Sequence, residues 1–155
     1  MAKNTIFAGC TSNNHPQVAE AFAGEAGIKA GMLLIKAAGE FVAHDVEGQG
    51  GMAYIANLDG LSQSGVDYTY DDGDTVFAFA PAPHQFFNVL IASGNNITAK
   101  DTPLTSNGDG YFKIAATDGT EEVLAYADEV ANFTSAAGFC RVKIGSFGFN
   151  NDTTA

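Results

Sequence analysis

Two acidic turns contain the side chains of this sequence that most resemble metal ligands. Asp71, Asp72 and Asp74 form one cluster, and Asn107 and Asp109 form the other. Carboxylate and amide oxygens are the ligands that Ca²⁺ prefers, but no Glu closes either cluster at the distance that the twelve-residue calcium loop requires. Asp, Asn and Gly also dominate ordinary hairpin turns. We therefore expect turns here and no metal site.

Candidate catalytic groups do not assemble into a recognisable site. The run GLSQSG places Ser64 where a nucleophile elbow around Ser62 would need glycine. His44 and Asp45 are adjacent on an expected strand, where neighbouring side chains point to opposite faces, so we expect a surface or half-buried histidine. Paired carboxylates at positions 71–74 leave a carbohydrate-cleaving enzyme as the least implausible catalyst. Because no nucleophile, base and orienting group come together, we predict no enzyme and no cofactor.

The charge balance limits the classes of partner. The formal net charge is −11, and no Lys or Arg occurs between Lys36 and Lys100. Binding to nucleic acid and to anionic membranes depends on Lys and Arg, so neither partner is expected. The start of the chain has no apolar segment typical of a signal peptide. We therefore expect Cys10 and Cys140 to be reduced.

Short strands must position whatever site exists. The segment GDTVFAFA alternates with both faces apolar, which favours a strand buried on two sides, and FFNVLIASG, PLTS, YFKIA, VLAYA and FCRVKIG follow at short intervals. The sequence NGDG at 107–110 indicates a type I′-like hairpin turn. A short apolar YIANL predicts a minor strand within a long excursion from Glu47 to Asp72. This spacing predicts an all-β fold, a compact antiparallel β-barrel or β-sandwich.

The chain divides into three zones. Residues 1–27 are expected to form an extended N-terminal arm or a short helix, because Pro16 precedes QVAEAFAG and Gly24 ends it. Residues 28–149 are expected to form a single β-domain. Residues 150–155 are expected to be a frayed tail. At most one or two short helices fit this organisation.

Apolar residues in the terminal zones lie outside the regular alternation of the strands. Apolar side chains in such zones can be buried by contact with a neighbouring subunit or another protein. The alternative is that they pack onto the chain's own barrel. We identify six candidates for a capsid or inter-subunit interface: Phe7, Pro16, Val18, Phe22, Phe147 and Phe149.

Several runs of the chain resemble the small capsid decoration, or cement, proteins of tailed bacteriophages. The runs that carry this resemblance are IKAGMLL, YTYDDGDTV, NVLIASGNNIT, KDTPLTSNGDG, LAYADE and RVKI, between Ile28 and Ile144. What they share with that family is the order and spacing of strands and turns rather than a catalytic motif. The sequence differs from the simplest members of that family in its long loop at 47–72 and in its longer N-terminal zone.

The resemblance implies a structural virion protein with a β-tulip-like fold. Proteins of this family are often trimeric and clamp neighbouring major capsid protein subunits on the outer surface of the expanded capsid. It therefore implies a homotrimer, assembly in the host cytoplasm, and the major capsid protein as partner. The alternative is a receptor-binding or fibre-associated phage surface protein.

Overall fold

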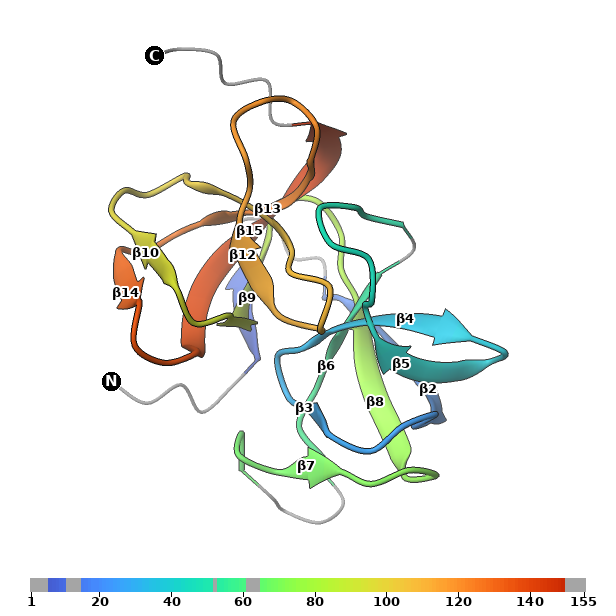
Figure 1. The fold of residues 1–155 in the computed structure, drawn as a ribbon. Coiled ribbons are helices and arrows are strands. Elements are labelled where there is room, and N and C mark those ends of the chain that lie inside the picture. The colour runs from blue at the N-terminus through green and yellow to red at the C-terminus, as the bar shows by residue number, and fades with distance from the viewer. Residues whose placement is uncertain (1–5, 11–14, 52, 61–64, 150–155) are drawn as a thin grey trace.

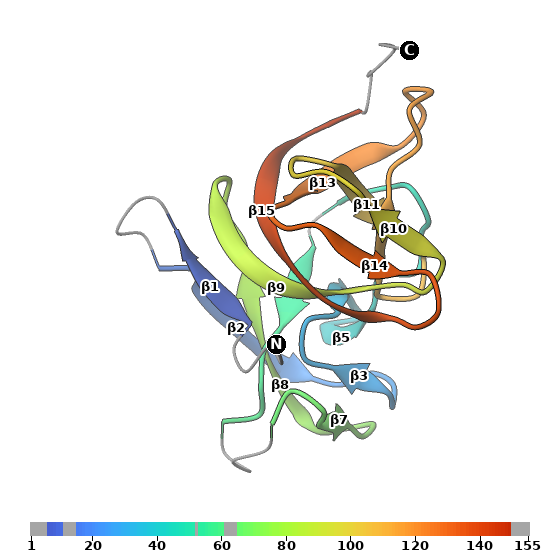
Figure 2. The same ribbon diagram turned by 90° about the vertical axis from the view of Figure 1, so that its left-hand side faces the viewer.

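The computed structural model describes residues 6–10, 15–51, 53–60 and 65–149, and for residues 10 and 146–149 it describes the backbone only. Within these ranges the chain forms strands and turns and no helix, which confirms the predicted all-β class. No helix long and apolar enough to cross a membrane occurs in the described ranges. The strands form two lobes, a barrel and a curled five-stranded sheet (Figures 1 and 2).

Five strands close into the barrel, because β9 pairs with both ends of the series β12-β11-β13-β15. Closure leaves the barrel without a free edge, which protects its backbone from further pairing. One contact is parallel, between Phe112 and Ile91, and the other pairings are antiparallel. The barrel strands are β9 (Gln85–Ile91), β11 (Pro103–Ser106), β12 (Phe112–Ile114), β13 (Glu122–Ala127) and β15 (Gly138–Phe149).

The second lobe is a sheet in the order β2-β8-β6-β4-β5. Its strands are β2 (Gln17–Phe22), β4 (Leu33–Ala37), β5 (Glu40–Ala43), β6 (Tyr54–Ala56) and β8 (Thr75–Ala80). The sheet curls until Ala23, just after β2, forms a bridge with Phe41 of β5. The strand expected at YIANL is β6, and it lies in the middle of the sheet rather than at its margin.

Shorter strands complete both lobes. The strand β1 (Phe7–Cys10) pairs with the start of β9. The pair β10 (Asn95–Ile97) and β14 (Ala131–Phe133) joins two loops of the barrel lobe. The pair β3 (Ile28–Lys29) and β7 (Thr69–Tyr70) lies beside the five-stranded sheet (Figure 1).

Each lobe has its own apolar core. The barrel core includes Phe87, Ile91, Leu104 and Phe112, and one face of the five-stranded sheet contributes Ile55 to it. The opposite face of that sheet encloses a second cluster that includes the buried side chains of Leu34, Phe41, Tyr70 and Val76. The double burial expected for GDTVFAFA follows from this arrangement, because β8 faces one core on each side.

Two local predictions were wrong. The short helix considered for the segment after Pro16 is the strand β2, whose six residues pair continuously with β8. A helix of two turns cannot stand alone, whereas a strand gains a full hydrogen-bonded partner. The hairpin at 107–110 forms, but its turn is not of type I′, because Gly108 and Gly110 have positive φ and Asn107 does not.

Candidate functional site

The acidic turns use their carboxylates to hold their own backbone. Oδ2 of Asp74 accepts hydrogen bonds from the Asp71 N–H at 2.8 Å and from the Tyr68 hydroxyl at 3.3 Å. The Asp109 carboxylate accepts the Tyr111 N–H at 3.1 Å. Within the described ranges, no group of three or more His, Cys, Asp and Glu side chains is placed to hold a metal ion. These carboxylates therefore have a structural role in their turns.

His44 is buried, with 1% of its surface exposed, so the expectation of a surface or half-buried histidine was wrong. Its Nδ1 lies 2.9 Å from Oγ of Ser106, and its Nε2 lies 3.2 Å from the carbonyl oxygen of Gly50. A Ser–His pair can act as nucleophile and base. Here Ser106 is also fully buried and accepts the Gly108 N–H at 3.1 Å. A substrate cannot reach this pair, which instead links the end of β5 to the end of β11.

The structure places the six interface candidates in different environments. Phe7 is half-buried and packs against the barrel core, with its ring centre 5.4 Å from that of Phe87. Pro16 is half-buried directly before β2. The backbones of Phe147 and Phe149 belong to the end of β15, and their side chains lie outside the described part of the structure.

Val18 and Phe22 are the candidates that the structure exposes most. They lie on β2 and are 58% and 60% exposed. Glu20, between them, pairs with Phe77 of β8, so all four side chains lie on one face of the sheet. We call Val18, Glu20, Phe22, Phe77 and Leu58 the β2–β8 face.

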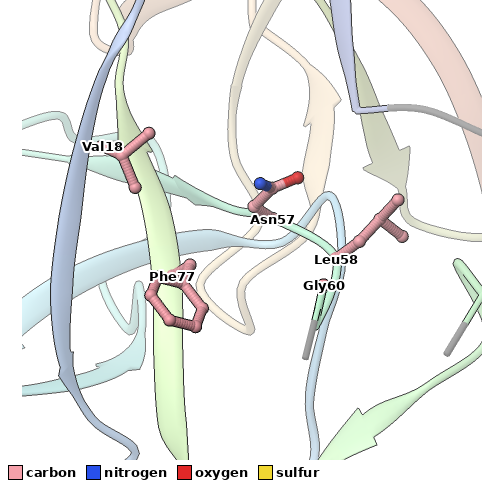
Figure 3. A pocket seen from close by; sticks show the side chains of 5 residues that line it. All are labelled: Val18, Asn57, Leu58, Gly60 and Phe77. Carbon is pink, nitrogen blue, oxygen red and sulfur yellow. The ribbon is translucent and has the colours of Figure 1, made fainter. Parts of the chain in front are cut away.

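The β2–β8 face contains a hollow of about 370 Å³ lined by Val18, Asn57, Leu58, Gly60 and Phe77. In Figure 3, Val18 and Phe77 come from neighbouring strands, and Leu58 stands across the hollow from them. The lining is almost entirely apolar, apart from the Asn57 amide. Such a surface can bind an apolar side chain of a partner, and it offers no group for acid–base chemistry.

Salt bridges lie along the barrel lobe. Lys113 pairs with Glu47 and Glu121, and Arg141 pairs with Asp128. Between Lys36 and Lys100 the sequence has Asp and Glu and no Lys or Arg, and the lysines of the sheet lobe are Lys29 and Lys36. The charged member of the β2–β8 face is Glu20.

Phe77 and Leu58 are members of this face that sequence reasoning did not identify. The alternation of GDTVFAFA predicts core positions on both of its faces, Phe77 included. In the structure Phe79 packs in the barrel core, whereas Phe77 on the same face is only half-buried beside β2. Alternation does not record this difference between two positions of one strand face.

No protein-family model and no curated protein matches the sequence. Among solved structures, the fold is similar to the crystal structure of the head fibre gp8.5 N base of bacteriophage phi29, with a TM-score of 0.56. The two chains are 18% identical, and the match covers 84% of this chain and 95% of that one. At this identity the comparison shows a shared fold.

Proposed function

We propose that this protein is a structural component of a bacteriophage virion that binds the outer surface of the expanded capsid. The observation that carries the proposal is the fold shared with the phi29 head fibre base over 84% of this chain and 95% of that one. The strand and turn runs that resemble capsid decoration proteins support it independently. The proposed partner is the major capsid protein, and the proposed assembly is a homotrimer made in the host cytoplasm.

A role in binding rather than catalysis agrees with the described side chains. The Ser–His pair is buried, the carboxylates of the acidic turns hold their own backbone, and two strongly exposed apolar residues, Val18 and Phe22, lie together on the β2–β8 face. A protein that binds the expanded capsid better than other states stabilises that capsid by mass action. Three linked copies would strengthen modest single contacts through effective concentration. In this proposal the protein clamps neighbouring capsid subunits.

A second candidate function is the base of a fibre on the phage head. The observation in its favour is that the solved structure with the same fold is the base of a head fibre. Such a base also needs a capsid contact, but it needs in addition a connection to a distal fibre. The two functions differ in what removal of the protein does to the capsid.

Co-sedimentation with phage heads tests the proposal. Heads made without this protein are mixed with the purified chain and sedimented, and their resistance to heat is measured. Binding to expanded heads with a higher disruption temperature supports the clamp, and binding with an unchanged temperature supports the fibre base. Absence of binding to expanded heads contradicts both. Sedimentation equilibrium of the free protein tests the trimer separately.

A further inference from the structure

The strand β2 is an edge strand over most of its length. Among the described strands its ladder is with β8 alone, and the parallel bridge between Ala23 and Phe41 brings β5 beside its last residue, Phe22. Edge strands are normally guarded by charged side chains, Pro, bulges, short length or a covering segment. The segment QVAEAF has six residues in continuous register with no Pro or bulge and Glu20 as its one charge, so its open edge is residues 17–21.

The outward edge of β2 is formed by every second residue. The Ala23 N–H donates to the Asp74 carbonyl on the side of β8, whereas the next N–H, of Gly24, donates to Phe41 on the opposite side. Because backbone groups of a strand alternate in direction, the N–H and C=O groups of Val18, Glu20 and Phe22 point away from β8, and those of Phe22 face β5 at the bridge between Ala23 and Phe41. The same three residues carry their side chains on the β2–β8 face.

The charge of β2 selects the chemistry of its partner. A second β2 pairing antiparallel about its centre would place Glu20 opposite Glu20, and like charges directly opposite are destabilising. A partner strand with Lys or Arg opposite Glu20 would make a favourable cross-strand pair instead. One neighbour two residues away would lie opposite Val18, and the other would reach the exposed ring of Phe22 on the same face, which favours apolar side chains at both positions.

We propose that β2 accepts an added strand, an extended segment of a partner protein that carries one Lys or Arg between two apolar residues on the same face. Main-chain hydrogen bonds to Val18 and Glu20 provide affinity in this mode, and the side chains provide specificity. The identity of the partner as a capsid protein rests on the proposed function. The strand-addition mode itself does not depend on it.

A synthetic peptide tests this mode on the full chain. The probe is the peptide Thr-Val-Thr-Lys-Thr-Val-Thr with an acetylated N-terminus and an amidated C-terminus. The control peptide is the same except that Glu replaces Lys. In nuclear magnetic resonance titrations at low salt, the Lys peptide is expected to slow the exchange of the Val18 and Glu20 amide protons. It should bind about five-fold tighter than the Glu peptide, because the central cross-strand pair changes sign.

Two variants at one position separate charge from backbone pairing. Glu20→Gln should keep binding of the Lys peptide but lose most of the preference over the Glu peptide. Glu20→Pro removes the outward N–H while leaving the β8 ladder intact, so it should abolish binding. Strand addition is overturned if the Lys peptide does not bind, if it protects amides elsewhere, or if the Pro variant binds as the Gln variant does. If the Lys peptide does not bind but the protein still binds expanded phage heads, strand addition is rejected and the proposed function is not.

Discussion

The hydroxyl oxygen of Ser106 lies 2.9 Å from Nδ1 of His44, and this buried contact joins the barrel to the five-stranded sheet. The Gly50 carbonyl accepts from Nε2 of the ring, so Nδ1 is the acceptor of the Ser106 proton. Backbone hydrogen bonds surround the contact, with Leu33 N–H donating to Gly110 and Gly110 N–H donating to His44. The two lobes are therefore fixed to each other by polar groups as well as by apolar packing.

Ser106→Ala is expected to destabilise the protein by about 1–3 kcal/mol, because it removes the buried hydroxyl that pairs with the Gly108 N–H and with His44 Nδ1, and the ring nitrogen keeps only the longer contact with the Val46 N–H at 3.4 Å. Urea denaturation followed by circular dichroism measures the change. Ser135→Ala, at an exposed serine, is the matched control and should be close to neutral. Equal stability of the two variants would show that the contact contributes nothing.

The fold class could be predicted from sequence because short alternating segments and turn residues recur along the chain. The link between the lobes could not, since it depends on Leu33, His44, Ser106 and Gly110, which are far apart in sequence. The alternation of EFVAHDV assigns His44 to one face of a strand but does not show whether that face is buried. The burial of His44 follows from the loop after β5 packing against β11, a tertiary contact that no local pattern records.

Gly110→Ala is expected to cost about 2–4 kcal/mol, combining the penalty for a left-handed backbone with crowding. Gly110 has φ of +79°, and an added Cβ would lie 3.1 Å from Cβ of Ala43 and within 2.4 Å of the Met32 methyl group. Gly94→Ala is the control, with φ of +90° and open space around the new Cβ, so about 1–2 kcal/mol is expected. Thermal denaturation should separate the two variants, and equal losses would argue against close packing at the junction of the lobes.

Lys113→Met is expected to destabilise the protein at neutral pH by about 1–3 kcal/mol, because Nζ lies 2.6 Å from Glu121 and 2.5 Å from Glu47 and is mostly shielded. Burial lowers the pKa of Lys113, but the hydrogen bonds to Glu121 and Glu47 outweigh it, so the pKa is raised above its ordinary 10.5. The stabilisation is thus present below pH 10.5 and is lost as pH rises through the raised value.

The test of the Lys113 pair is the difference between wild type and variant in urea denaturation at neutral pH and at about pH 11. This difference should shrink in alkali. Burial raises the pKa of Tyr68 and of Tyr70 above the ordinary value for tyrosine, and both residues are common to both proteins. Lys100→Met is the control, because its ammonium is 64% exposed and 3.8 Å from Asp128, so about 0–1 kcal/mol is expected. A difference that stays constant with pH would contradict the role of the charge.

The candidate surface was only partly visible in the sequence. Val18 and Phe22 could be identified because apolar residues in a polar terminal zone are unusual. Phe7 had the same appearance, yet its ring packs against Phe79 and Phe87 within the chain. The difference lies in strand pairing, since β1 docks on β9 over the barrel core, whereas β2 presents alternate residues to solvent. Whether the six candidates form an interface stays a prediction.

Val18→Ser combined with Phe22→Ser is expected to weaken binding to expanded phage heads by at least about ten-fold while leaving folding stability nearly unchanged, because both side chains are more exposed than buried. Val130→Ser is the matched control, since Val130 is 64% exposed on the barrel lobe and lies away from β2. Co-sedimentation over a range of protein concentrations gives the affinities, and thermal denaturation checks the fold. If the Val130 variant loses as much affinity as the double variant, or if the double variant binds like wild type, the β2–β8 face is not the docking surface.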